Sequence, residues 1–261
     1  MRLTSTAAAP IAQPPATPAP AVTPPTLPHA KVSPAPTSEL AVSGGQVGMV
    51  LVDATGARSF GTLLSDVSWS TMKVPVALAA LRKGTAQPGL LSAALQSSDN
   101  AAAQAMWDSL GAPNVAGRAV QAEIAQVAAA PQVQTQAVRP GFSAFGQTQW
   151  SLVDQATFGY RLPCHDLGAQ VTELMGAVAP SQRYGLGTLS GAHFKGGWGP
   201  GPNGAYLVRQ FGYVDTSTGR YGVAIAAIAN DGTYESAQTL LTQLASHIPA
   251  TTGTQGSPTC S

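Results

Sequence analysis

Strand-like segments lie at both ends of the folded part of this 261-residue sequence, and helix-like segments lie between them. Near the N-terminal end, residues 46–63 are typical of a β-hairpin with its turn at 53–56. Near the C-terminal end, three strands are expected at 192–198, 206–215 and 220–230, joined by a glycine-rich loop and then by a tight turn. This order predicts an α/β fold: one antiparallel sheet flanked by helices, with an inserted helical region.

The helical pattern is clearest at 70–82, where apolar residues recur at the spacing of one buried face. Pro75 is tolerable only within about one turn of a helix start, which places the N-terminus of this helix near Ser70. Gly84 is a suitable stop signal. Further helices are expected at 90–110 with a break at SSDN, and at 115–127, 151–162, 166–178 and 236–248, while 128–149 is expected to be a loop.

The N-terminal segment differs in composition from the rest of the chain. The first 38 residues contain ten of the 21 prolines, mixed with Ala, Thr and Ser. Such a segment buries too little apolar surface to offset its ordering entropy, so 1–44 is expected to be a disordered linker. The folded domain is expected at 45–250 and a C-terminal tail at 251–261.

The linker composition favours a secreted or cell-envelope protein whose signal or anchor is missing from this chain, since no signal-peptide core is present. No apolar run reaches the ~20 residues of a membrane helix. With a net charge of +1 and no basic run, a nucleic-acid partner is not expected. No metal or cofactor motif is present. Cys164 and Cys260 either form a disulfide or remain two thiols.

The stretch STMK places Ser70 and Lys73 three residues apart, hence on one face of the expected helix. Serine needs a base within hydrogen-bond reach to act as a nucleophile, and lysine serves as a base where burial or nearby positive charge lowers its pKa. A helix N-terminus also directs backbone N–H groups toward a developing oxyanion.

Two further stretches add to this motif. SSDN, with Ser98, Asp99 and Asn100, interrupts a helical pattern, and by itself indicates a cap or turn. Lys195 lies in FKGGW on an expected strand, where the glycines allow another backbone to approach, so that a substrate can align like an extra strand.

Together, S-x-x-K at a helix start, S-D-N, and K-G-G on a late strand follow the order found in β-lactamases and penicillin-binding proteins. From about Gly45 to Ile248 the sequence resembles a class A β-lactamase-like serine hydrolase of the β-lactamase/DD-peptidase superfamily. The resemblance implies a β-lactamase/transpeptidase-like fold and a small substrate, such as a β-lactam or peptidoglycan-like compound. A monomer is expected.

The resemblance also implies roles for individual residues. Ser70 is the implied nucleophile, Lys73 its base or base partner, and Ser98 the proton relay to the leaving group. Lys195 is the residue that lowers local pKa values and attracts the substrate's carboxylate.

The implied substrate-binding residues are Asn100, Gly197, Trp198 and Arg209. Asn100 holds Lys73 and the substrate amide, and the backbone N–H groups of Ser70 and Trp198 form the oxyanion hole. Arg209 binds a substrate carboxylate, although an isolated arginine on a strand is also typical of a surface residue.

Three departures from the family pattern bear on function. Gly196 has no hydroxyl where the family usually has Thr or Ser, and the chain between Ser70 and Ser98 is short, which predicts a reduced helical region and a more open cleft. Between Glu123 and Asp154 there is no acidic residue.

The expected loop therefore lacks the glutamate that activates the deacylating water in class A enzymes. It offers the glutamines Gln132, Gln134 and Gln136, and glutamine cannot act as a general base. The sequence thus predicts an acyl-enzyme that forms and persists.

Competing interpretations remain at this point. His193 shares a strand face with Lys195 and is either an acid–base group or a packed residue. A Ser-His-Asp triad using His165 and Asp166 is weaker, because no G-x-S-x-G elbow is present. The alternatives to an enzyme are a β-lactam- or peptidoglycan-binding sensor that acylates without turnover, and a structural cell-envelope domain.

Overall fold

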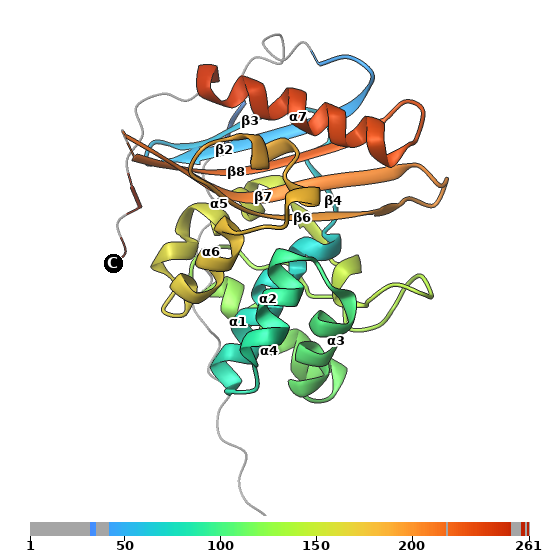
Figure 1. The fold of residues 1–261 in the computed structure, drawn as a ribbon, viewed down its shortest axis with the longest axis vertical. Coiled ribbons are helices and arrows are strands. Elements are labelled where there is room, and N and C mark those ends of the chain that lie inside the picture. The colour runs from blue at the N-terminus through green and yellow to red at the C-terminus, as the bar shows by residue number, and fades with distance from the viewer. Residues whose placement is uncertain (1–31, 35–41, 218, 252–256, 259, 261) are drawn as a thin grey trace, which may run out of the picture.

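The computed structural model describes residues 32–34, 42–217, 219–251, 257–258 and 260. Six strands form one sheet in the order β1-β3-β2-β8-β7-β6 (Figure 1). Their bounds are β1 Val32–Pro34, β2 Gly45–Asp53, β3 Gly56–Gly61, β6 Ala192–Pro200, β7 Tyr206–Thr216 and β8 Gly219–Ala229.

Strands from early and late in the sequence pair inside this sheet. Strand β2 pairs antiparallel with β8, from Gly45 opposite Ala229 to Val52 opposite Gly222. The β2–β3 hairpin turns between Asp53 and Gly56, as its sequence predicts. The expected antiparallel sheet flanked by helices is therefore confirmed.

Three residues of the expected linker at 1–44 form a strand. Val32–Pro34 forms β1, which pairs in parallel with β3 at the edge of the sheet. Proline is tolerated there because an edge strand can leave one side of its backbone unpaired. Residues 1–31 and 35–41, and most of the expected tail at 251–261, lie outside the described residues.

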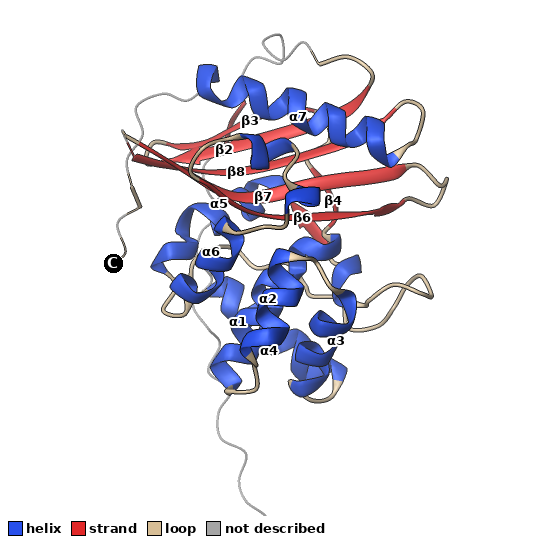
Figure 2. Cartoon of the chain, in the orientation of Figure 1, coloured by secondary structure: helices blue, strands red, loops and turns tan. Residues whose placement is uncertain are grey.

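Helices cover both faces of the sheet, and Figure 2 shows them in blue above and below the red strands. On one face lies α7; on the other lies α5, with the remaining helices beyond it (Figure 1). The α-helices are α1 Lys73–Lys83, α2 Pro88–Gln96, α3 Asn100–Ser109, α4 Pro113–Ala125, α5 Leu152–Arg161, α6 Gly168–Gly176 and α7 Tyr234–Thr251.

The start of α1 differs slightly from its prediction. A 3₁₀ turn, η2 (Trp69–Met72), precedes the α-helix, so Ser70 lies in this turn and Lys73 is the first α-helical residue. Gly84 ends α1 with φ of +73°, a left-handed conformation that glycine adopts without steric cost.

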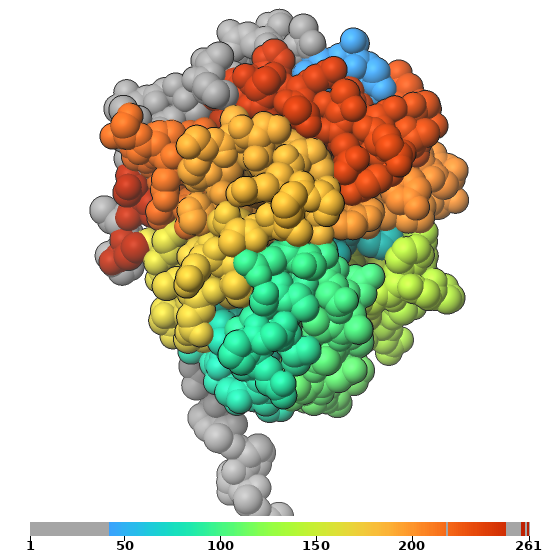
Figure 3. All heavy atoms as spheres, in the orientation of Figure 1, coloured from blue at the N-terminus to red at the C-terminus, as the bar shows by residue number. Residues whose placement is uncertain are grey.

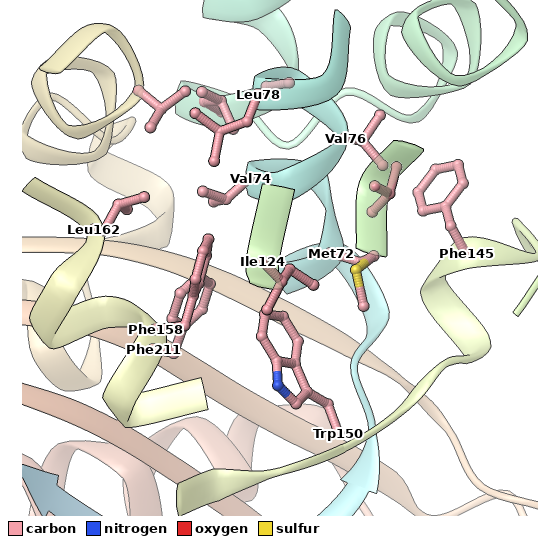
Figure 4. Close-up of a cluster of buried hydrophobic side chains, with 14 of the residues drawn as sticks. Met72, Val74, Val76, Leu78, Ile124, Phe145, Trp150, Phe158, Leu162 and Phe211 are labelled. Carbon is pink, nitrogen blue, oxygen red and sulfur yellow. The ribbon is translucent and has the colours of Figure 1, made fainter. Parts of the chain in front are cut away.

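A buried cluster anchors this start of α1 against the sheet. Figure 4 shows Met72 and Val74 with Trp150, Phe158 and Phe211 around them, and the three aromatic ring centroids lie 5.7 to 5.9 Å apart. Met72 and Val74 are fully buried, and burial of such a side chain stabilises a fold by roughly 1.5–3 kcal/mol. Packing on Met72 and Val74 therefore holds Ser70 and Lys73 in place.

The SSDN stretch separates two helices. α2 ends at Gln96 and α3 begins at Asn100. The Asp99 carboxylate caps α3 by accepting a hydrogen bond from the Ala102 N–H over 2.7 Å. The break positions Ser98 in an exposed turn with φ of +59°.

Cys164 and Cys260 form a disulfide, which settles the alternative that the sequence leaves open. The bond joins the C-terminal segment to the turn η4 (Leu162–Cys164) after α5. None of the helices in the described part of the chain combines the length and hydropathy that a membrane crossing requires.

Candidate active site

A cleft of about 580 Å³ lies where the helices, the end of β6 and the loop at 128–149 meet. Its lining residues are Trp69, Ser70, Ser98, Asn100, Ala101, Gln104, Gly141, Phe142, Ser143, Trp198, Gly199, Pro200 and Tyr206. In Figure 3 the loop is the yellow-green segment beside the green helices and below the orange strands. Four of the eight predicted site residues, Ser70, Ser98, Asn100 and Trp198, therefore line one cleft.

The Ser70 turn approaches β6 because β6 has glycine where the two meet. A Cβ on Gly197 would lie 2.8 Å from the backbone nitrogen of Ser70 and 2.9 Å from that of Thr71. A Cβ on Gly199 would lie 2.6 Å from the Trp69 ring. Gly197 itself lies behind the cleft wall, and its missing side chain lets the strand reach the Ser70 amide.

Lys73 is the first residue of α1, directly after the turn that contains Ser70, and is 1% exposed. Its Nζ donates hydrogen bonds to the carbonyl of Ser98 and, over 2.8 Å, to Oδ1 of Asn100, and lies 3.3 Å from Oγ of Ser98. Burial lowers the pKa of Lys73 to about 8, against a smaller opposing effect of Asp99. About one tenth of Lys73 is therefore neutral at pH 7, and about half at pH 8.

Lys195 reaches the same hydroxyl from the sheet. Its Nζ donates to Oγ of Ser98 over 2.8 Å and to the carbonyl of Gly196 over 2.9 Å. Burial, and then the charge of Lys73, lower the pKa of Lys195 well below its usual value. The turn at Ser98 thus brings together two lysines that lie far apart in the sequence.

The hydroxyl of Ser70 has no hydrogen-bond partner among the described residues. Two strained residues flank this group: among the described residues, Trp69 with φ of 48° and Ser98 with φ of 59° are the non-glycine residues with positive φ. Such conformations cost about 1–3 kcal/mol each and gather at functional sites, where the surrounding structure enforces them.

Arg209 is a correction to the sequence analysis. It is fully buried, and its guanidinium donates to the carbonyls of Asp66, Val67 and Trp150 and to Oε1 of Gln155 at 2.6 to 3.1 Å. The two terminal nitrogens of the Arg209 guanidinium, which was expected to bind a substrate carboxylate, therefore donate to groups of the protein instead.

The packing over this strand gives the physical reason. Arg209 pairs with Gly197 and so lies on the same face of the sheet as Lys195, but other segments cover its guanidinium. There it joins the sheet to the small β4–β5 ladder, β4 Ser65–Val67 and β5 Gln149–Ser151.

The loop at 128–149 reaches the cleft with residues other than the three glutamines. Gln147 holds the loop: its Oε1 accepts from the Arg139 N–H over 2.7 Å, and its Nε2 donates to the carbonyl of Ser143 over 3.3 Å. Phe142 and Ser143 line the cleft, whereas Gln132, Gln134 and Gln136 do not.

No residue that lines the cleft is acidic, within the part of the chain that the structure describes. The aromatic lining residues come from four separate segments. The sequence indicated Trp198 among them and missed Trp69, Phe142 and Tyr206. Their only sequence signal was local: Trp69 directly precedes Ser70, and Phe142 is an aromatic residue in a glycine- and proline-rich loop.

The two histidine alternatives are packed elsewhere. His193 stacks on Tyr213 at 4.7 Å between ring centroids, and its Nδ1 lies 2.8 Å from the carbonyl of Thr172. His165 is buried, with Nε2 3.0 Å from Oε2 of Glu123. Neither histidine lines the cleft around Ser70.

No protein-family model and no curated protein sequence matches this chain. Solved structures do resemble it. A variant of the last common ancestor of Gram-negative bacteria class A β-lactamase has a TM-score of 0.61 at 17% identity, covering 83% of this chain and 96% of that one. A β-lactamase from Burkholderia vietnamiensis has a TM-score of 0.62 at 18% identity, covering 81% and 93%.

A class A β-lactamase from Bacteroides cellulosilyticus has a TM-score of 0.64 at 13% identity, covering 80% of this chain and 92% of that one. Identities this low establish the fold and leave the chemistry to the residues of this chain. The chain has the fold of the class A β-lactamases.

Proposed function

We propose that this protein is a serine acyl-transfer hydrolase of the β-lactamase/DD-peptidase type, which forms a covalent acyl-serine on Ser70. The acyl donor is a β-lactam or a D-alanyl peptide-like amide or ester. One observation carries this proposal: Ser70 opens into the cleft one residue after a strained Trp69, while Lys73, with its pKa lowered to about 8, is the first residue of α1, directly after the turn that contains Ser70.

In the proposed acylation step, Oγ of Ser70 attacks the carbonyl carbon and its proton passes to the neutral Nζ of Lys73. A neutral amine has two N–H donors and one lone pair. The carbonyl of Ser98 and Oδ1 of Asn100 accept the two donors, which leaves the lone pair for the Ser70 proton.

The leaving group then departs with its bonding electrons and takes a proton from the hydroxyl of Ser98. Lys73 returns the proton taken from Ser70 to Ser98, so the count of protons closes. Lys195 holds the Ser98 hydroxyl in place from the other side. The oxyanion accepts hydrogen bonds from the backbone N–H groups of Ser70 and Trp198, and the close approach of Gly197 to the Ser70 nitrogen supports this pairing.

Deacylation requires a water molecule and a base to activate it. The cleft lining contains no carboxylate in the described part of the chain, so hydrolysis of a β-lactam-derived acyl-enzyme is slow. This observation also favours the second candidate function, a sensor of β-lactams or peptidoglycan fragments that acylates once without turnover.

Intact-mass spectrometry with benzylpenicillin tests the proposal. The expected result is a mass increase of one penicillin that is absent in Ser70→Ala and retained in Ser143→Ala, the matched control for the other serine hydroxyls of the cleft. Sustained turnover of nitrocefin or a simple ester would support the hydrolase, and a single stoichiometric burst the sensor. Absence of any adduct or turnover with these compounds would exclude both.

We also propose that the protein is exported to the cell envelope or secreted. The disulfide between Cys164 and Cys260 supports this location, since disulfides persist in oxidising compartments. Thiol titration of protein taken directly from the extracellular fraction and from the cytosol tests it, and free thiols with no exported protein would contradict it.

A further inference from the structure

Aromatic side chains form much of the wall of the cleft. Trp69, Phe142, Trp198 and Tyr206 all line it, together with Pro200. The rings of Trp69 and Phe142 meet edge to face, with centroids 5.2 Å apart, and Phe142 is 37% exposed. Flat apolar walls of this kind favour flat apolar ligand groups, because burying both surfaces removes them from water.

The polar part of the wall is uncharged. The remaining polar lining residues carry hydroxyl or amide groups: Ser70, Ser98, Asn100, Gln104 and Ser143. These groups can orient a neutral carbonyl or amide by hydrogen bonds. They offer no counter-charge to an ionised group on a ligand.

The two lysines at the site lie beneath the surface. Lys73 is 1% exposed and Lys195 is fully buried. Lys195 donates to Ser98 and Gly196, and Lys73 to Ser98 and Asn100. A carboxylate in the cleft would have to lose its water without direct access to either ammonium group, which is unfavourable.

The arginines near the site are also engaged. The four acceptors described above surround Arg209. Arg139 donates to the carbonyl of Pro200, and its guanidinium lies over the rings of Phe142 and Trp69, 4.9 and 5.7 Å from their centroids. Arg139 thus joins the loop to β6 and backs the aromatic wall.

A second hollow of about 460 Å³ lies next to the cleft and shares the lining residues Trp198 and Tyr206 with it. Tyr234 closes the aromatic row, with its ring centroid 5.6 Å from that of Trp198 and 5.9 Å from that of Tyr206. Two acidic residues, Asp231 and Glu235, line this hollow. They repel a carboxylate on the ligand.

We infer that this site takes an uncharged ester or amide carrying an aromatic or similarly flat apolar group, and discriminates against a carboxylate beside the scissile bond. The inference rests on the proposed acylation of Ser70 and specifies its substrate class. It also accounts for Gly196, which supplies no hydroxyl for such a carboxylate.

Benzylpenicillin and its methyl ester provide a matched pair that differs in the charge of the carboxylate. The second-order rate constant for acylation of Ser70 is measured for each by intact mass. The rate constant of the methyl ester is expected to be about tenfold higher. This factor reflects the cost of placing an unpaired charge, rather than a neutral group, at a poorly solvated site.

Two nitrophenyl esters test the aromatic preference. After correction for their reactivity with hydroxide, 4-nitrophenyl phenylacetate is expected to acylate Ser70 about tenfold faster than 4-nitrophenyl acetate. Phe142→Ala is expected to reduce this ratio. Val138→Ala, in the same loop with a 69% exposed side chain, is the matched control and leaves the ratio unchanged.

The results with these four compounds distinguish a wrong substrate class from a failure of Ser70 acylation. Faster acylation by the free acid than by the methyl ester, or equal rates for the phenylacetate and the acetate, would overturn the inference while Ser70 acylation stands. If none of the four compounds acylates Ser70, the proposed function fails and the inference fails with it.

Discussion

Lys195 donates a hydrogen bond to the hydroxyl of Ser98 across 2.8 Å, although 97 positions separate them in the sequence. Lys73 approaches the same oxygen to 3.3 Å. With two lysines directed at its oxygen, the Ser98 hydroxyl is free to direct its own proton toward the cleft that it lines.

Removal of the Ser98 hydroxyl is expected to slow acylation by about 10²–10⁴-fold, the usual contribution of a positioned proton donor. Both Ser98→Ala and Ser98→Gly lose the hydroxyl. Because residue 98 has φ of 59°, the free energy of unfolding of the glycine variant is expected to exceed that of the alanine variant by about 1–2 kcal/mol. Urea unfolding and mass-resolved acylation measure the two effects; equal stabilities would show that the strain is absent in solution.

The rate of acylation is expected to rise with pH and to level off above about pH 8. Burial lowers the pKa of Lys73 to about 8, and the neutral amine is the proposed base, so below that pH the rate falls about tenfold per unit. Because the pKa of Lys73 is lower in the folded state, the unfolded state binds this proton more tightly. The free energy of unfolding therefore increases as the pH rises from about 8 toward the pKa of 10.5 that lysine has in the unfolded chain.

Single-turnover acylation between pH 6 and 9.5 checks this dependence. A rate that stays constant across this range would contradict the role of Lys73 as the base. Stability is measured in parallel, so that loss of folded protein is not taken for loss of activity.

Asn100→Asp is expected to lower acylation at pH 7 and to move the plateau to higher pH. Oδ1 of Asn100 accepts from Nζ of Lys73 over 2.8 Å, and a carboxylate at that position raises the pKa of the lysine. An acidic residue is tolerated at the first position of α3 because of the helix dipole. Gln104→Glu adds the same charge to the cleft on the same helix and serves as the control; an equal shift in both variants would exclude a local effect.

Gly197→Ala is expected to reduce acylation by about 10²–10³-fold through displacement of the oxyanion hole. Its Cβ would lie 2.8 Å from the Ser70 nitrogen, so β6 and the Ser70 turn must separate. Gly196→Ala is the matched control next to it, since its Cβ would meet nothing nearer than 3.8 Å. Acylation rates and unfolding curves of both variants are compared, and similar losses in the two would contradict this explanation.

Loss of the disulfide is expected to lower the free energy of unfolding by about 2–4 kcal/mol and to leave the acylation rate of the folded protein unchanged. The bond closes a sequence separation of 96 residues and lies outside the cleft lining. Cys260→Ser, Cys164→Ser and the double variant should lose the same amount. A larger loss for Cys164→Ser alone would point to packing at that residue.

Much of the fold followed from local patterns. Alternation and turn residues located the strands at both ends of the chain, and helical periodicity located most helices to within a few residues. The order of the strands did not follow, because pairing depends on contacts between distant segments. The prediction also missed β1, since three residues within a proline-rich segment carry no strand signal of their own.

The candidate site was predicted in part. Ser70, Lys73, Ser98, Asn100 and Lys195 do lie together, and their proposed roles await the experiments above. Arg209 was misplaced because the segments that cover its guanidinium, with the carbonyls of Asp66 and Trp150, pack over it only in the folded chain. Of the aromatic lining residues only Trp198 was predicted. Trp69, Phe142 and Tyr206 were missed because their segments meet only in the folded chain.

Residue type and spacing indicate which chemistry is available: a serine with a lysine on the next helical turn, two glycines after a strand lysine, and a loop without an acid. These properties do not depend on distant contacts. The position of each charge follows from the folding of the chain in three dimensions. Folding buried Lys73 and Lys195 beside Ser98, placed Arg209 against backbone carbonyls, and left the cleft with an uncharged, aromatic wall, because burial and partners depend on which segments pack together.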